Sequence, residues 1–253
     1  MKRLLIALAL FVVLSAPVAA ITPRRGMMAG RPGDMALLGA SWWTSGTLAG
    51  QGRGFVPTIA GRGELTALRY TRSHGWAMSF VAPNIQAGAN MTAREVAIGL
   101  RRVARLWPYK KLVSPTFAGS CADGDYNYSL SDVVAEYRTL YGEDPWFDAI
   151  GVQVAAGDAA DAICRAEAVI SEARDLGYDE AEVWLAGFSC WPDTEDKPGY
   201  MRAMLGYING SEVMRYNWHP ARPEPGIWYD WSGLKLIDEN GALTELGAVY
   251  AAP

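Results

Sequence analysis

Short runs of apolar residues alternate with amphipathic helical patterns along most of this chain. The clearest helical pattern starts after Thr92, which is followed by Glu95 and by apolar residues at helical spacing. Strands that are apolar at every position are typical of a parallel sheet with helices outside it. About eight such runs favour an α/β fold with a single (β/α)8 TIM-like barrel over a doubly wound sheet. The expected strands are 37–43, 55–59, 76–81, 111–117, 147–154, 182–188, 213–218 and 233–237. The expected helices are 64–73, 93–106, 131–141 (capped by Ser131 or Asp132), 161–176, 198–208 and one that begins near Thr244.

The length of 253 residues suits one such barrel, which we place at residues 37–253. Residues 21–36 contain several arginines, glycines and prolines and are expected to form a flexible lead-in. The formal net charge of −4 gives no basic footprint, so nucleic acid is not expected as a partner.

The first twenty residues have the pattern of a secretory signal peptide. Lys2 and Arg3 precede an apolar run that is too short to span a bilayer comfortably, and small residues follow it up to Ala20. Cleavage is expected after Ala20, and Ile21 in place of a cysteine argues against a lipid anchor. We therefore expect a secreted protein, extracellular or periplasmic, with no membrane anchor after cleavage and a monomeric state.

Three cysteines, Cys121, Cys164 and Cys190, each follow a different expected strand on the same edge of the sheet. An oxidising destination makes one disulfide plausible, either Cys121–Cys164 or Cys164–Cys190. The first pairing is preferred because adjacent strands carry both residues. The cysteine spacing matches no zinc motif, so no metal is expected. Only His74 and His219 could pair with a nucleophilic cysteine. No cofactor is expected either.

Seven segments in order resemble the glycosyl hydrolase catalytic core family that includes glycoside hydrolase family 128. They are Gly39–Trp43, Phe55–Ile59, Ser79–Thr92, Leu112–Pro115, Phe147–Val154, Val183–Phe188 and Leu236–Tyr250. The resemblance covers nearly all of the chain after the signal peptide. It implies a small barrel of a group that mostly acts on β-1,3-glucan with two catalytic glutamates.

The chain departs from that family at the positions of the two catalytic glutamates. The resemblance places the acid/base glutamate at Ala82 and the nucleophile at Gly187. Retaining hydrolysis requires two carboxyl groups about 5–5.5 Å apart, and neither alanine nor glycine can supply one. Neighbouring family positions also differ, namely Val81, Asn84, Gln153 and Val154, which indicates that the site diverged as a unit.

The first hypothesis is therefore a pseudoenzyme that binds a polysaccharide or oligosaccharide, of β-glucan type by resemblance, without cleaving it. Aromatic and amide side chains at strand ends could contact the sugar: Trp42, Trp43, Asn84, Gln86, Gln153, Phe188, Trp191 and Trp218. The alternative interpretation is that Trp42, Phe188 and Trp218 only pack the barrel.

Two other hypotheses remain open. The chain could be an active glycosidase that uses substrate assistance or relocated carboxylates. Asp193 and Glu195 are the best substitutes, because they follow the strand that lost its glutamate. The further loop candidates are Asp123, Asp125, Asp158, Glu224 and Asp230. Alternatively, the barrel is a structural or interaction scaffold, with the apolar loop 223–231 as a docking segment.

Overall fold

The computed structural model describes residues 24–28, 30, 31, 33–50, 52–68, 75–86, 88–108, 110–121, 126–222 and 232–252. Several expectations lie outside these residues. They are the signal peptide, His74, the candidate carboxylates Asp123, Asp125, Glu224 and Asp230, and the loop 223–231.

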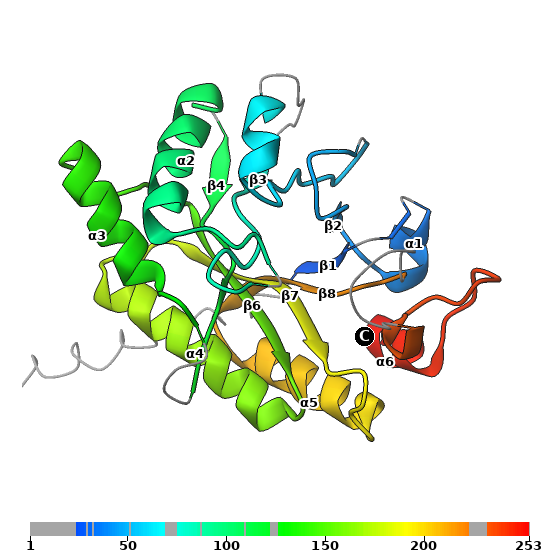
Figure 1. Ribbon diagram of the computed structural model, residues 1–253. Helices are drawn as coiled ribbons and strands as arrows, with labels where there is room; N and C mark the ends of the chain where they lie inside the picture. The colour runs from blue at the N-terminus through cyan, green and yellow to red at the C-terminus, as the bar shows by residue number, and fades with distance from the viewer. Residues whose placement is uncertain are drawn as a thin grey trace, which may run out of the picture.

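The centre of the molecule is a curved parallel sheet that forms a half-barrel of seven strands (Figure 1). The strand order is β2-β1-β8-β7-β6-β4-β3, and the short strand β5 pairs with β6 at one side of this path. The bounds are β1 Arg24–Met28, β2 Trp42–Thr44, β3 Trp76–Met78, β4 Lys111–Val113, β5 Phe117–Ala118, β6 Ala149–Ala156, β7 Glu182–Cys190 and β8 Val213–Trp218. An α/β fold with parallel strands is therefore confirmed.

The expected strand 55–59 is present only as two isolated parallel bridges. Phe55 bridges Trp43 next to β2, and Thr58 bridges Met78 in β3. The Val56 N–H donates to the Trp43 carbonyl (2.8 Å) and the Met78 N–H to the Pro57 carbonyl (2.9 Å). Residues 55–58 therefore connect the two strands that stand at the ends of the strand order.

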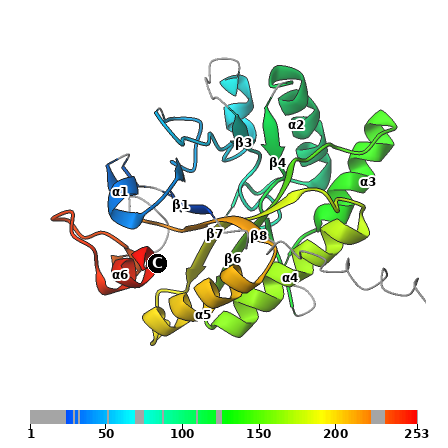
Figure 2. The same ribbon diagram turned by 180° about the vertical axis from the view of Figure 1, so that it is seen from behind.

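The α-helices cover the outer side of the sheet (Figures 1 and 2). They are α1 Asp34–Leu38, α2 Ala93–Leu106, α3 Leu130–Tyr141, α4 Ala159–Asp175, α5 Lys197–Gly210 and α6 Glu245–Ala251. The Thr92–Glu95 capping box at the start of α2 is confirmed. No helix in the described ranges has both the length and the apolar character needed to cross a membrane.

Two apolar clusters fill the fold. The larger one lies between the sheet and the helices, and the smaller one gathers Trp42, Val56, Met78, Val113, Ala149, Trp184 and Ala186 inside the curved sheet. Side chains of a strand point alternately to the two faces, and here both faces are covered.

The flexible lead-in expected at residues 21–36 is wrong for its described part. Arg24–Met28 is the strand β1, which lies between β2 and β8. The arginines made this strand look like a loop in the sequence, but Arg25 is half-buried and hydrogen-bonded: its Nε donates to the Tyr216 hydroxyl (3.1 Å) and its Nη1 to the Ala251 carbonyl (3.0 Å). The domain therefore begins before residue 37.

The expected strand 37–43 is also corrected. Leu37 and Leu38 end the helix α1, because Gly39 adopts the left-handed conformation (φ 63°) that stops a helix. Only Trp42 and Trp43 of that run belong to β2.

Smaller differences concern element ends. Helix α3 begins at Leu130, one residue before the expected start, and its cap is Ser129 and not Ser131 or Asp132: the Ser129 N–H donates to Asp132 Oδ2 (2.9 Å). The start of the expected helix 64–73 is a 3-10 turn at Arg62–Thr66, and a second 3-10 turn occupies Ser232–Leu234 in the expected strand 233–237.

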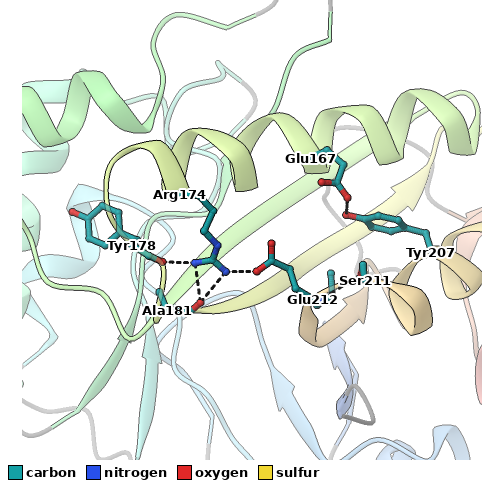
Figure 3. A network of polar contacts seen from close by, with 8 residues as sticks. Glu167, Arg174, Tyr178, Ala181, Tyr207, Ser211 and Glu212 are labelled. Carbon is teal, nitrogen blue, oxygen red and sulfur yellow. Dashed lines mark hydrogen bonds and ion pairs between the residues drawn. The ribbon is translucent and has the colours of Figure 1, made fainter. Parts of the chain in front are cut away.

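Covalent and polar ties hold α4 in place. Cys121 and Cys164 form a disulfide, the pairing preferred from the sequence, while Cys190 is a buried free thiol. At the other end of α4, the Arg174 guanidinium donates to the Tyr178 and Ala181 carbonyls and pairs with the Glu212 carboxylate (Figure 3).

Candidate active site

Hydrogen bonds through Thr116 connect Ala82 to Gln153, and Gln153 lies next to Gly187; Ala82 and Gly187 are the two positions to which the resemblance assigns the glutamates. The Ala82 N–H donates to both the carbonyl (3.0 Å) and the hydroxyl (3.1 Å) of Thr116. The Thr116 hydroxyl donates to Gln153 Oε1 (3.2 Å). An ideal Cβ placed on Gly187 would lie 3.5 Å from Gln153 Cγ. Ala82, Gln153 and Gly187 thus lie together, although they are far apart in sequence.

The backbone at both positions is unusual. Ala82 has φ 39° and is 1% exposed, and Gly187 has φ 138°. The strand register between β7 and β8 shifts between Leu185 and Phe188, so Gly187 sits in a β-bulge. Residues other than glycine rarely adopt a φ near 138°, and such backbone conformations are often found at functional sites.

The groups that join these positions are all neutral. They are a backbone N–H, a hydroxyl and a carboxamide, which can donate and accept hydrogen bonds but cannot supply general acid or base catalysis at neutral pH. In the part of the chain that the structure describes, no three histidine, cysteine or carboxylate side chains gather as metal ligands. This arrangement can therefore recognise hydroxyl groups, which present both donors and acceptors.

Four of the aromatic candidates lie in the core. Trp42, Phe188 and Trp218 are fully or almost fully buried, and Trp43 is only 5% exposed against Phe55. The indole N–H groups of Trp42 and Trp218 donate to the Arg24 (3.1 Å) and Leu234 (2.8 Å) carbonyls. At these four positions, the cover on both faces of the sheet keeps the rings away from solvent. We therefore assign these four rings to packing and not to sugar binding.

The remaining candidates divide into one structural residue and three accessible ones. Asn84 is buried, and its Nδ2 donates to the Ala118 (3.0 Å) and Tyr128 (3.2 Å) carbonyls, so it holds neighbouring loops together. Gln86 is exposed, Gln153 is partly exposed, and Trp191, directly after β7, is 49% exposed.

Within the described residues, the candidate substitute carboxylates are in solvent-facing loops. Asp193 and Glu195 are exposed in the connection from β7 to α5. The Thr194 N–H donates to the Trp191 carbonyl (3.1 Å), which makes this connection a tight turn. Asp158 caps α4 by accepting the Asp161 N–H, so its carboxylate has a structural role.

His219 follows β8, and its backbone N–H donates to the Phe188 carbonyl (3.1 Å). Burial lowers the pKa of its imidazole to about 4, so the ring is neutral at pH 7. Thr116, the residue that links Ala82 to Gln153, was not among the residues singled out from the sequence. Its only sequence signal is a hydroxyl near the end of an expected strand.

Comparison with known proteins gives one family. The family described as the glycosyl hydrolase catalytic core matches residues 41–250. No curated protein matches this chain.

Solved structures with the same fold include three family 128 proteins. An endo-β-1,3-glucanase of subgroup II from Sorangium cellulosum has a TM-score of 0.68 and 21% identity, covering 90% of this chain and 98% of its own. A subgroup I endo-β-1,3-glucanase variant from Amycolatopsis mediterranei, in complex with laminaripentaose, has a TM-score of 0.70 and 18% identity, with coverages of 91% and 99%. A subgroup III curdlan-specific exo-β-1,3-glucanase from Blastomyces gilchristii, in complex with glucose, has a TM-score of 0.68 and 18% identity, with coverages of 91% and 98%. The fold thus resembles that of β-1,3-glucanases.

Proposed function

Because this chain belongs to the glycosyl hydrolase catalytic core family, we propose that it binds a β-1,3-glucan and does not cleave it by a two-glutamate mechanism. The resemblance supplies the class of ligand. The neutral cluster around Gln153 supplies the argument against catalysis.

One observation carries this proposal: Gln153 lies against Gly187 and is joined through Thr116 to Ala82. A retaining mechanism needs one carboxyl group to protonate the leaving oxygen and a second to attack the anomeric carbon. Neither Ala82 nor Gly187 carries a side chain that can do this. Gln153, which lies beside them, carries a neutral amide that can donate and accept hydrogen bonds but can neither protonate the leaving oxygen nor attack the sugar.

Trp191 is the aromatic surface of the proposed site. Its indole follows the same strand as Gly187 and is 49% exposed, whereas the other aromatic candidates are buried. Sugar-binding clefts typically combine flat apolar rings with a few placed polar groups. The exposed Gln86 amide is a further hydrogen-bonding group in the loop that follows Ala82.

We propose two further properties of this protein. Its strands form a closed (β/α)8 barrel, and the protein is exported from the cytoplasm. Closure is supported by the bridges of residues 55–58 to both β2 and β3, which join the ends of the strand order. Export is supported by the signal-peptide pattern of residues 1–20 and by the Cys121–Cys164 disulfide, which suits an oxidising compartment.

The test is to incubate the purified protein with insoluble curdlan and with laminarin, and to measure binding by pull-down and cleavage by reducing-end release. Binding without release is expected. Trp191→Ala is expected to weaken binding about two- to tenfold, the range for loss of an aromatic stacking contact. Trp146→Ala is the matched control, because that indole is 78% exposed but lies before β6, at the opposite edge of the sheet.

Release of reducing ends would contradict the proposal. If release disappears in Asp193→Asn or Glu195→Gln, a relocated carboxylate performs the chemistry. Absence of binding to either polymer would refute the assigned class of ligand.

A further inference from the structure

A hollow lies at the opposite edge of the sheet from Gln153 and Gly187. It has a volume of about 900 Å³ and is bordered by Arg24 and Arg25 of β1, Ser41 before β2, and Arg202 and Asn209 of α5. The last helix, α6, closes one side, since Val249 and Ala252 also border the hollow. Helices α5 and α6 pack against each other there (Figures 1 and 2). We call this hollow the arginine groove.

The described lining of the arginine groove contains three arginines and no aspartate or glutamate. Its other polar groups are hydroxyls and an amide, from Ser41, Tyr216 and Asn209. Hydrogen-bond donors therefore predominate on its surface. The whole chain has a formal net charge of −4, so this positive surface is a local feature and not a consequence of overall charge.

Arg25 is fixed at the base of the groove. Its Nε donates to the Tyr216 hydroxyl (3.1 Å), and its Nη1 donates to the Leu38 (3.1 Å) and Ala251 (3.0 Å) carbonyls. All of these acceptors are neutral. The Nη2 of Arg25 also donates to the Ala252 carbonyl (2.5 Å). These bonds orient the guanidinium, and among the described residues no carboxylate forms an ion pair with it.

Arg24 and Arg202 supply two further charges, and both are exposed. Within the described ranges, neither forms an ion pair. Arg24 also stands in register with Arg215 of the neighbouring strand, whose only described ion pair is with Glu182 (3.6 Å). Burial lowers the pKa of Arg215 and the charge of Arg24 lowers it further, with Glu182 opposing, as expected where positive charges crowd together.

We propose that the arginine groove binds an oxyanion group, namely a phosphate, a sulfate or a carboxylate. Guanidinium groups present planar N–H donors that match such oxygens, and charge-assisted hydrogen bonds of this type are stronger than neutral ones. The groove lies at the amino ends of the strands, away from the proposed sugar site, so the two sites bind independently.

The experiment titrates the full-length folded protein with inorganic phosphate, and separately with glucuronate, at constant ionic strength set with sodium chloride. Binding is followed by isothermal calorimetry. Saturable binding of either probe is expected, and Arg24→Ala combined with Arg202→Ala should weaken it at least tenfold. Phosphate binding alone would assign a phosphate- or sulfate-type ligand, and glucuronate binding alone would assign a carboxylate.

The matched control is Arg105→Ala with Arg102→Ala, which removes the same charge from the exposed side of α2. This control should leave binding unchanged. Equal weakening by both pairs, or no saturable binding of either probe, would overturn the proposal. If the first double variant does not fold, Arg202→Ala alone carries the test, because Arg202 lies exposed on α5. Curdlan binding should be unaffected in all these variants, which separates failure here from failure of the proposed function.

Discussion

Replacing Gly187 tests whether this site could still hold a catalytic glutamate. Gly187 has φ 138° in a β-bulge, and its nearest neighbours to an added Cβ are Gln153 Cγ at 3.5 Å and Cδ at 3.6 Å. These are ordinary contact distances, so space does not forbid a side chain. The backbone conformation opposes a side chain, because placing a non-glycine residue at such a φ costs about 1–3 kcal/mol of folding free energy.

Gly187→Ala is therefore expected to lower the free energy of unfolding by about 1–3 kcal/mol. For a domain of this size, each kcal/mol corresponds to about 2–4 °C in the melting temperature. Urea denaturation followed by tryptophan fluorescence gives the free energy, and a thermal melt gives the second estimate. Gly206→Ala is the matched control: Gly206 is exposed within α5 with no heavy atom near an added Cβ. There, alanine should stabilise the helix by about 0.5–1 kcal/mol.

Gly187→Glu, alone or with Ala82→Glu, should carry the same backbone cost and should not restore laminarin hydrolysis. A glutamate at either position would have to adopt a positive φ, and one at Gly187 would also contact Gln153, so two correctly placed free carboxylates are not expected to form. A Gly187→Ala variant as stable as the parent protein, or release of reducing ends from laminarin by the double glutamate variant, would refute this expectation.

Three further perturbations have defined outcomes. The pKa of His219 is about 4 in the folded protein, against an ordinary value of 6.5. The free energy of unfolding should therefore be highest above pH 6.5 and fall by about 3 kcal/mol as the pH drops to about 4. In His219→Gln, the free energy of unfolding from urea denaturation should depend less on pH over that range, and an unchanged pH profile would exclude this cause. The Cys121–Cys164 disulfide closes a loop of 43 residues, so reduction should destabilise the protein by up to about 4 kcal/mol, and equal denaturation midpoints with and without reductant would contradict this. Arg174→Met removes the bonds to the Tyr178 and Ala181 carbonyls and to Glu212, with an expected loss of about 1–3 kcal/mol, whereas a neutral effect in urea denaturation would show that the network is replaceable.

Much of the secondary structure could be predicted because its signals are local. The capping pair Thr92–Glu95 and the apolar run 182–188 each identify their element without reference to the rest of the chain. The strand β1 could not be found in this way. Its arginines do not resemble strand residues, and only Tyr216 and Ala251, distant in sequence, explain how Arg25 is accommodated.

The site was harder to predict than the fold. Which tryptophans reach solvent depends on whether both faces of a strand are covered, and this is a property of the closed packing and not of the sequence around Trp43 or Trp218. The association of Gln153 with Gly187 likewise depends on the bulge in β7. The sequence singled out both residues but could not show that one lies against the other.

The position of β1 also sets the order in which this protein can fold. The strand lies near the beginning of the chain, yet it pairs with β8, where Arg24 is in register with Arg215. The Tyr250 hydroxyl, close to the other end, donates to the Gly26 carbonyl (2.7 Å). Contacts of such long range make folding slow, because most of the chain must be present before they can form. Until then, the facing edges of β2 and β8 offer unpaired backbone groups to other chains. A chain in which β1 has not yet paired is thus more prone to aggregate than the finished protein.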